Sequence, residues 1–180
     1  GALPACGRNG PHQSDGASGF QFESCKKIKT EYVKSKQPIL PVVEETVAGL
    51  TTHPQLLNKT INILPEGNSL DAVFYSLDIQ RVLQNLIINA GYVTEKEGTV
   101  DIRIVRNDGF LKVSVTDKGC GIPEDVQKFL FKDTLTTKKD GNGLGLLSCK
   151  GIVEENHQGK LWFETEVGKG TTFHFTLPDL

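Results

Sequence analysis

The chain has 180 residues, of which 37% are hydrophobic and 23% charged, and its formal net charge is −2. This length suits one domain with its own core plus an appended segment. The small net charge gives no electrostatic footprint for nucleic acid or an anionic membrane. No apolar run approaches the ~20 residues of a membrane helix, and no secretion signal opens the chain. The 4 cysteines form no C-x-x-C pair, which indicates reduced thiols rather than a metal site or a disulfide framework.

The N-terminal part of the chain lacks the pattern of a folded domain. Residues 1–24 are rich in Gly, Pro, Ser, Asn and Gln and show no apolar periodicity, which predicts a linker or an appended segment. Residues 25–36 carry five lysines, which favours a solvated, helical connector, with a docking surface for a neighbouring domain as the alternative. We therefore expect a flexible segment over 1–35 and one folded domain over 36–180.

The first elements of that domain are short. Pro41 at a first helical position, followed by apolar residues, predicts a helix that ends near Gly49. Residues 59–64 alternate like a strand, and residues 65–68 read as a turn. Residues 72–75 are a second short apolar strand candidate.

The longest helix is expected over residues 79–94, with Asp78 as its N-terminal cap. Its apolar residues recur at helical spacing, which predicts that one face is buried. That stripe consists of Val82, Leu83, Leu86, Ile87 and Ala90.

Two hairpins follow this helix. Apolar residues alternate over 100–104 and 111–115 around an Asn-Asp-Gly turn, and again over 161–166 and 171–177 around a Gly-Lys-Gly turn. The strands then pair mostly antiparallel in a mixed sheet, with the helices between strand groups on one face. The sequence thus predicts an α+β domain, a two-layer α/β sandwich.

Two glycine clusters frame the region between the hairpins. The first directly follows a strand, and the second opens a helix that reads as ending near Glu155. Glycines let backbone N–H groups approach phosphates, and a helix N-terminus favours anions. Either cluster alone is equally consistent with a simple turn. The clusters are Asp117-Lys118-Gly119-Cys120-Gly121-Ile122-Pro123 and Gly141-Asn142-Gly143-Leu144-Gly145-Leu146.

Two amides lie on one face of the long helix, because Asn85 and Asn89 are four residues apart. Amides among apolar neighbours are costly unless something satisfies them. They either bond a neighbouring loop backbone or direct their carbonyl oxygens into a cavity. In the second case they suit Mg²⁺, which prefers oxygen ligands and is usually shared with substrate phosphates.

These motifs, in this order, resemble those of the GHKL superfamily of gyrase, heat-shock chaperone, histidine kinase and mismatch-repair ATPases. Residues 81–90 resemble its N box, and the two glycine clusters resemble its G1 and G2 boxes. Residues 129–131 and 135–138 are similar to the F box of histidine kinases, and the segment from 159 to 173 also matches sensor histidine kinases. The resemblance covers about residues 36–180 and implies the Bergerat-type ATP-binding fold.

The resemblance also implies roles for single residues. Asp117 would bind the adenine amino group, with Gly121 beneath the base. Asn89 would supply the main protein ligand to Mg²⁺, and Asn85 would lie beside the triphosphate as a catalytic group. Other residues assigned to the nucleotide pocket are Tyr92, Gly119, Ile122, Leu144 and Leu146.

Between the two glycine clusters the family carries a mobile ATP lid, here residues 124–140. Thr137 and Lys138 would lie near the γ-phosphate, with Lys138 as the second catalytic group. The far end of the lid would pack against the phosphates through Gly141, Gly143 and Gly145. The side chains expected to pack the lid against the domain are Phe129, Phe131 and Leu135.

Asn85 favours a kinase within this superfamily. Relatives that hydrolyse ATP usually carry a glutamate four residues before the magnesium asparagine, and an amide cannot act as the general base. The resemblance thus implies the catalytic domain of a two-component sensor histidine kinase. It would bind Mg·ATP and pass the γ-phosphoryl group to a histidine on a separate dimerisation domain. A response regulator receiver domain would be the downstream partner, the parent protein a cytoplasmic homodimer with or without a membrane anchor, and nucleic acid no partner.

The chain departs from the family in three places. None of His12, His53, His157 and His174 lies in a phosphoacceptor motif. Tyr92 occupies a position where many kinases carry a basic residue, and the F box lacks its usual proline and paired phenylalanines. A nucleotide-binding pseudokinase that signals by docking is therefore the alternative, whereas Asn85 disfavours an ATP-driven clamp.

The cysteines near the expected pocket are Cys120 and Cys149. Free cysteine is usually a small buried hydrophobe, so we expect both thiols to be buried. Redox control of ATP binding is the alternative.

Overall fold

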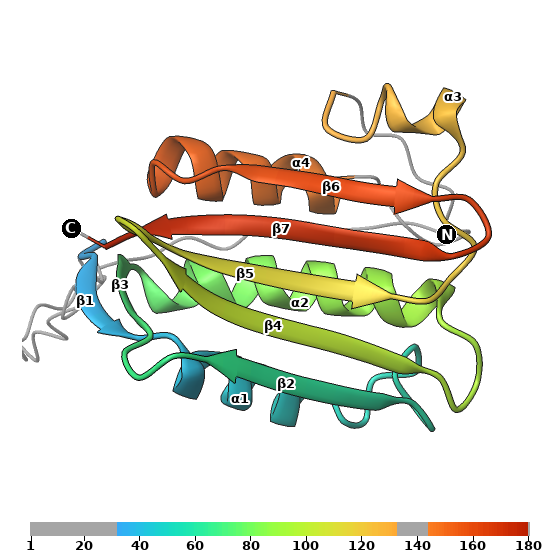
Figure 1. Cartoon of the computed structure of the whole chain (residues 1–180), viewed down its shortest axis with the longest axis horizontal. Helices are drawn as coiled ribbons and strands as arrows, with labels where there is room; N and C mark the ends of the chain where they lie inside the picture. The colour runs from blue at the N-terminus through green and yellow to red at the C-terminus, as the bar shows by residue number, and fades with distance from the viewer. Residues whose placement is uncertain (1–31, 133–143, 180) are drawn as a thin grey trace, which may run out of the picture. The chain divides into compact units, whose positions relative to one another are not determined.

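The structure, a computed structural model, describes residues 32–132 and 144–179. Its main sheet has five strands in the order β2-β4-β5-β7-β6, and β1 and β3 form a separate two-stranded sheet (Figure 1). The elements are β1 (Ser35–Pro38), α1 (Leu40–Gly49), β2 (Thr60–Glu66), β3 (Asp71–Phe74), α2 (Ser76–Val93), β4 (Thr99–Asn107), β5 (Phe110–Asp117), α3 (Glu124–Gln127), α4 (Leu144–Lys150), the π-helix η1 (Gly151–Asn156), β6 (Leu161–Glu166) and β7 (Gly170–Pro178).

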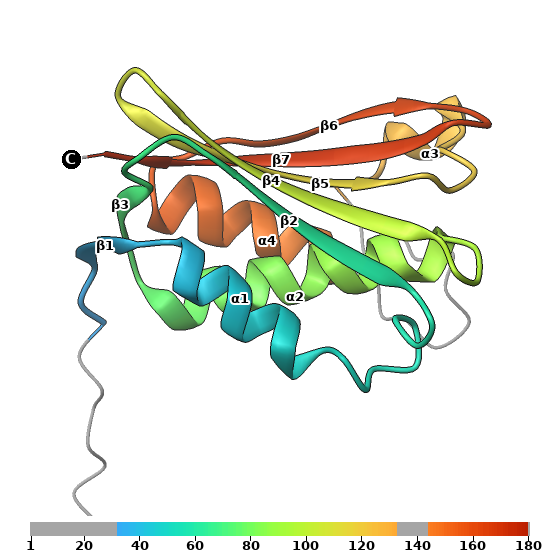
Figure 2. The ribbon, with the colours of Figure 1, turned by 60° about the horizontal axis from the view of Figure 1, so that its bottom comes forward.

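The main sheet carries α1, α2 and α4 on one face (Figure 2). The apolar stripe predicted for α2 is buried throughout, and it packs against inward-facing residues of β4, β5 and β7. This arrangement confirms the predicted α+β, two-layer α/β sandwich. No helix in the described part of the chain has the length and apolar character needed to cross a bilayer.

Both predicted hairpins are present. In β4 and β5, Ile104 faces Val113 across the antiparallel pair, and β7 continues the same buried row with Phe175 opposite Val113. The β6–β7 pair forms the second hairpin, in which Phe163 lies opposite Phe173. Strand β2 pairs parallel with β4, which makes the sheet mixed.

Three local predictions were wrong. Residues 35 and 36, expected at the end of a connector, belong to β1, which pairs antiparallel with β3. Residues 65 and 66, expected in a turn, belong to β2, an edge strand where a proline without an N–H group is tolerated. Asp78 does not cap α2, which begins at Ser76 after Tyr75.

Asp78 instead ties the first described residues to the domain. Its carboxylate is 8% exposed, and its Oδ2 accepts hydrogen bonds from the Tyr32 hydroxyl at 2.6 Å and the Asn156 amide at 3.5 Å. The Lys34 ammonium group donates to the Asn156 carbonyl at 2.7 Å. The segment ahead of β1 is thus fastened to the first turn of α2 and to the end of η1.

His157, which is fully buried, joins η1 to the start of α2. The Tyr75 N–H donates to its Nε2 at 3.1 Å, and its Nδ1 lies 2.8 Å from the Ile152 carbonyl oxygen. Because Nε2 accepts, Nδ1 carries the proton and donates to Ile152. The neutral ring therefore satisfies two backbone groups on different elements.

Acidification is expected to weaken the fold through His157. Burial keeps the pKa of His157 below its usual value; the hydrogen bond with the Ile152 carbonyl and the Asp78 charge oppose this shift, and the Lys34 charge adds to it. The unfolded chain therefore binds a proton near pH 6.5 that the folded chain does not, so the free energy of unfolding falls as the pH drops below about 6.5. Urea unfolding at about pH 7.5 and about pH 5.5 measures this loss. The loss should shrink in His157→Gln and, because burial also lowers the pKa of His174, it should shrink in His174→Gln as well. An undiminished loss in His157→Gln would assign the effect to another group.

Candidate nucleotide site

The first component of the site is Asp117, the last residue of β5. It is 5% exposed, and its Oδ1 accepts hydrogen bonds from the backbone N–H groups of Gly119 at 2.9 Å and Thr171 at 3.2 Å. Burial raises the pKa of Asp117, and these two bonds oppose the rise. Both hydrogen bonds that the described residues donate to this carboxylate reach Oδ1, which leaves Oδ2 for a ligand.

The turn after Asp117 is fastened to the β6–β7 hairpin. The Gly168 N–H donates to the Cys120 carbonyl at 2.8 Å, and the Ile122 N–H donates to the Thr165 hydroxyl at 2.9 Å. Gly121 has a φ of 74°, and a side chain there would overlap the backbone of the hairpin. The hairpin therefore requires glycine at this position, independently of any ligand.

Gly119 and Ile122 pack the same turn against α2 and the core. A Cβ on Gly119 would lie 2.7 Å from Val93 Cγ2, so the turn packs tightly on the end of α2. The Ile122 side chain packs partly buried against the core.

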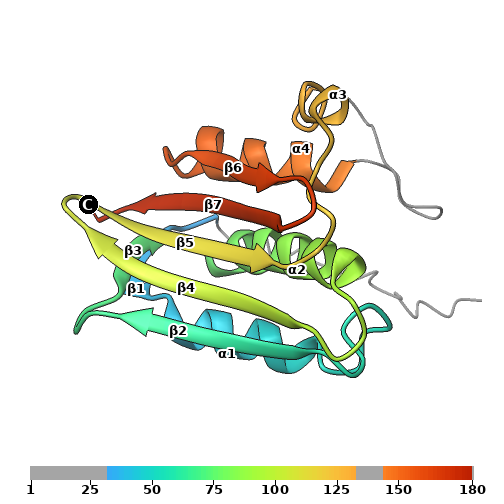
Figure 3. The same cartoon turned by 45° about the vertical axis from the view of Figure 1, so that its right-hand side comes forward.

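Helix α2 contributes the amides. Asn85 and Asn89 are both half-buried, and Tyr92, three residues further on, is 41% exposed. Asn85 Nδ2 donates to the Arg81 carbonyl at 3.1 Å. Helix α2 contacts both β5 and α4. Figures 1 and 3 show the second half of α2, the end of β5 and the start of α4 at the same end of the domain.

The second glycine cluster is only partly described. Helix α4 begins at Leu144, two residues earlier than predicted, and continues into η1, which ends at Asn156, close to the predicted end near Glu155. Gly145 and Leu146, in its first turn, are both half-buried. The remaining residues that the resemblance assigned to this region lie outside the described residues, namely Leu135, Thr137, Lys138, Gly141 and Gly143.

The segment after α3 is anchored by one of its two phenylalanines. Phe131 lies 5.8 Å from the Phe163 ring, and the Lys150 ammonium group lies 5.1 Å above the Phe131 ring. Phe129, which was expected to pack against the domain as well, is 47% exposed. The expectation for Phe129 was therefore wrong, because Phe131 alone meets the aromatic surface of β6.

The two thiols differ. Cys149 is fully buried, whereas Cys120 is exposed, so the expectation of two buried thiols was wrong for Cys120. Burial raises the pKa of Cys149 to about 12, and a hydrogen bond with the Asn85 side chain opposes the rise. Cys149 is thus a neutral thiol near neutral pH.

The amide oxygens of α2 are candidate ligands for a metal ion at this site. The described residues contain no cluster of three or more His, Cys, Asp or Glu side chains that could hold a metal. A single amide oxygen suits Mg²⁺, which retains several waters and takes further ligands from phosphates. The donor chemistry of Asn89 thus fits that ion.

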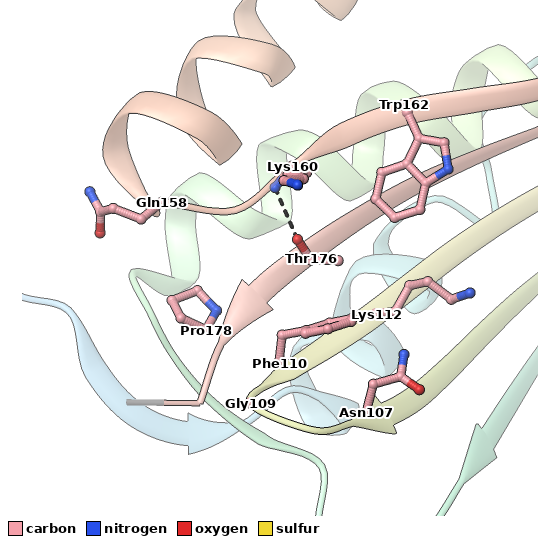
Figure 4. A pocket seen from close by; sticks show the side chains of 9 residues that line it. All are labelled: Asn107, Gly109, Phe110, Lys112, Gln158, Lys160, Trp162, Thr176 and Pro178. Atoms are coloured by element: carbon pink, nitrogen blue, oxygen red, sulfur yellow. Dashed lines mark hydrogen bonds between the residues drawn. The ribbon is translucent and has the colours of Figure 1, made fainter.

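A groove of about 600 Å³ lies on the opposite, uncovered face of the sheet (Figure 4). Its residues alternate with the buried residues of β5 and β7, which places it away from the amides and Asp117. Trp162 lies at its edge and stacks on His174 at 5.0 Å between ring centroids. The groove is lined by Asn107, Gly109, Phe110, Lys112, Gln158, Lys160, Trp162, Thr176 and Pro178.

Comparison with protein families gives a match over most of the domain. The family described as "Histidine kinase-, DNA gyrase B-, and HSP90-like ATPase" matches residues 75–180. Among curated proteins, an adaptive-response sensory kinase SasA of Synechococcus sp. (strain JA-2-3B'a(2-13)) is 40% identical over 105 residues, which cover 56% of this chain and 28% of SasA. Sporulation kinase E of Bacillus subtilis (strain 168) is 32% identical over 173 residues, which cover 88% of this chain and 23% of the kinase. The chain thus spans about a quarter of the length of these relatives.

Solved structures of histidine kinases superpose on this chain. The nucleotide-free catalytic domain of histidine kinase ThkA superposes with a TM-score of 0.73 and 28% identity, covering 81% of this chain and 95% of ThkA's domain. ThkA in complex with the response regulator protein TrrA superposes with a TM-score of 0.70 and 25% identity, covering 82% of this chain and 42% of ThkA.

Proposed function

Because this chain belongs to the family of histidine kinase-, DNA gyrase B- and HSP90-like ATPases, we propose that it is the ATP-binding catalytic domain of a two-component sensor histidine kinase. The resemblance seen in the motifs is thereby confirmed, and ATP is the nucleotide of the family. The observation that supports the proposal is that the end of β5, the second half of α2 and the start of α4 lie at the same end of the domain, with α2 in contact with both β5 and α4. The reaction is transfer of the γ-phosphoryl group of Mg·ATP to a histidine side chain supplied by another domain.

Asp117 recognises the base in this proposal. Its Oδ1 is held by two backbone N–H groups, so Oδ2 accepts a hydrogen bond from the exocyclic amine of adenine. Guanine presents a carbonyl oxygen at the equivalent position, which a carboxylate repels. Selection of ATP over GTP follows, since a buried polar group left unpaired is costly.

In this proposal the side-chain amides of Asn85 and Asn89 on α2 act at the triphosphate and its metal ion. The Asn89 oxygen is a ligand to Mg²⁺, which also binds the phosphates. Asn85 lies beside the triphosphate and has no basic form near neutral pH, so it does not activate water. Catalysis then rests on positioning and on neutralisation of charge by Mg²⁺ and Lys138, which matches phosphoryl transfer by kinases.

The partners are those that a histidine kinase needs. A dimerisation domain with a phosphoacceptor histidine supplies the nucleophile, and a homodimeric parent brings the two domains together. A response regulator receiver domain takes the phosphoryl group afterwards, and ThkA, with a similar fold, was solved with the response regulator TrrA. We place the domain in the cytoplasm. Because Tyr32 and Lys34 are bonded to it and β1 begins at Ser35, the domain extends from Tyr32 rather than from residue 36, and residues 1–31 are its connecting segment.

One specific observation supports a second candidate function. Tyr92 occupies a position where many histidine kinases carry a basic residue, and its side chain is 41% exposed. Loss of a charged contact with phosphate weakens ATP binding about tenfold or more. A nucleotide-binding module that signals by docking, without phosphoryl transfer, is therefore the alternative.

Calorimetric titration of the chain with ATP, with and without Mg²⁺, tests the nucleotide and metal assignments. Wild type should bind ATP more tightly with Mg²⁺ than with EDTA, and Asn89→Ala should lose most of that difference because the metal loses its protein ligand. Asn62→Ala, a change on the outer face of β2, is the matched control, since Asn62 bonds Asp101 at 2.7 Å. Equal Mg²⁺ dependence in Asn89→Ala and wild type would remove Asn89 from the metal site.

Phosphotransfer is tested with radiolabelled ATP and the dimerisation and acceptor helices of a sensor histidine kinase supplied as a second protein. The expected product is an acid-labile, alkali-stable phosphohistidine on the acceptor helices. ATP binding without this product would favour the docking alternative, and rapid ATP hydrolysis by the chain alone would favour a clamp.

A further inference from the structure

The Thr165 hydroxyl, on β6, joins the two backbone segments that hold Asp117. It accepts a hydrogen bond from the Ile122 N–H at 2.9 Å, which fixes the far end of the turn after Asp117. It also lies 3.2 Å from the Gly170 carbonyl oxygen and 2.8 Å from the Thr171 hydroxyl, at the start of β7. Thr171 in turn donates its backbone N–H to Asp117 Oδ1 at 3.2 Å. One side chain thus fastens the turn on one side of the carboxylate and the strand on the other.

The hydrogen-bonding capacity of the Thr165 hydroxyl is fully used. A hydroxyl has one O–H donor and two acceptor lone pairs. The Gly170 carbonyl oxygen only accepts, so Thr165 donates its proton there. The Thr171 hydroxyl then donates to Thr165, and the Ile122 N–H takes the second lone pair. A valine would fit the same space without a hydroxyl, and it would remove a hydrogen-bond partner from all three groups.

A role in the sheet alone accounts for only part of this arrangement. Thr165 faces Thr171 across the β6–β7 pair, and threonine pairs between antiparallel strands stabilise a sheet by themselves. The Thr116 and Thr172 hydroxyls, 3.0 Å apart on β5 and β7, form such a pair on the other face. Thr165 differs because it also binds the Ile122 N–H, which belongs to the turn and not to the sheet.

We propose that Thr165 is a positioning residue for base selection, which fixes the Asp117 carboxylate before a nucleotide binds. This inference rests on the proposed function, because there Asp117 Oδ2 accepts a hydrogen bond from adenine. Oδ1 is held by the N–H groups of Gly119 and Thr171, and each of these belongs to a segment that Thr165 fastens. Without the hydroxyl the turn and the strand can shift independently, and Oδ2 moves with them. A site that is ordered in advance spends less free energy on binding.

The test compares Thr165→Val, which removes the hydroxyl, with Thr165→Ser, which keeps it. Calorimetry on the whole chain measures the dissociation constants of Mg·ATP and of Mg·purine riboside triphosphate, which lacks the exocyclic amine. Thr165→Val should weaken Mg·ATP about three- to tenfold, as loss of one hydrogen bond predicts. The analogue should change less than about twofold, because it makes no bond to the carboxylate. Thr165→Ser should keep the wild-type preference for ATP.

Two further variants exclude trivial explanations. Thr116→Val is the matched control, since it removes a hydroxyl from the threonine pair on the other face of the sheet, and it should leave both dissociation constants unchanged. Thr165→Ala is measured in parallel and should behave like Thr165→Val, so the test does not depend on how well a valine is accommodated.

A double-mutant cycle and a readout without nucleotide separate positioning from a general loosening. If Thr165 acts through Asp117, Thr165→Val should cause no further loss of Mg·ATP affinity in an Asp117→Asn background. The Gly119 N–H bonds Asp117 Oδ1 at 2.9 Å, so its amide resonance reports the position of the carboxylate. In the nucleotide-free chain this resonance should shift in Thr165→Val and stay near its wild-type position in Thr165→Ser.

Equal losses for the two nucleotides in Thr165→Val, an additive cycle, or an unshifted Gly119 resonance would each overturn the inference. Wild type is the reference for all three measurements. A wild-type chain that binds Mg·ATP no more tightly than the analogue without the amine contradicts the role of Asp117 in the proposed function instead, and the inference falls with it.

Discussion

Asp117→Asn is expected to weaken binding of Mg·ATP by about 10- to 150-fold, because a hydrogen bond to a charged group is lost and an amide N–H can face the adenine amine. Titration calorimetry measures the change. Asp108→Asn, an exposed carboxylate in the β4–β5 turn, is the matched control, since it removes the same charge at the other end of the strand. Normal ATP affinity in Asp117→Asn would mean that the base is recognised elsewhere.

The same substitution should leave the fold as stable as wild type or make it more stable. Burial raises the pKa of Asp117 above its usual value, so the charged carboxylate costs stability at neutral pH and this cost fades as the pH falls toward about 4. An asparagine still offers an oxygen to the Gly119 and Thr171 amides. Urea unfolding at neutral and acidic pH should therefore show an advantage for Asp117→Asn that shrinks on acidification. A loss of both stability and affinity would indicate collapse of the turn rather than loss of recognition.

Gly121→Ala is expected to destabilise the domain by about 2–4 kcal/mol, because it combines backbone strain with a steric clash. The φ of Gly121 is 74°, and a methyl group would overlap the backbone of Glu166 and Val167. Nucleotide affinity should fall as well, since the turn that presents Asp117 would shift with the hairpin.

Gly109→Ala separates the two contributions to that cost. Gly109 has a φ of 81°, but a Cβ there would meet nothing within 4 Å. Its cost should be about 1 kcal/mol, from strain alone. Urea midpoints compare the two variants, and similar values would show that the hairpin yields to a methyl group at Gly121.

Local patterns predicted much of the fold. Apolar residues recur at every second position along the strands of the first hairpin and along β7, so the two faces of these strands can be assigned without knowing the partner strand. The apolar residues on α2 likewise recur at helical spacing within their own segment, and every residue of this stripe is buried. These features need only the neighbours in sequence, which is why the two-layer architecture was predictable.

Features that depend on distant partners were not predictable in this way. Asp78 looked like a cap because it precedes an apolar stripe, yet Tyr32 and Asn156, far away in sequence, bind its carboxylate. Strand β1 has no alternating pattern and exists through its pairing with β3. Cys120 is exposed because it occupies the outer side of a turn whose backbone, rather than side chains, contacts the hairpin.

The site was predictable only as a set of motifs. Spacing placed Asn85 and Asn89 on one helical face, and the resemblance linked them to Asp117. It could not show that Gly121 is required by the hairpin and Gly145 by the Asn85 amide. The fit of Gly145 against the Asn85 amide has meaning only once α4 is known to lie against α2.

The ties made by Tyr32 and Lys34 have a mechanical consequence. Both bonds end on the elements that frame the amide row, since Asp78 lies in the first turn of α2 and Asn156 closes η1. Any rotation of residues 32–34 relative to α2 and η1 therefore requires that both hydrogen bonds break.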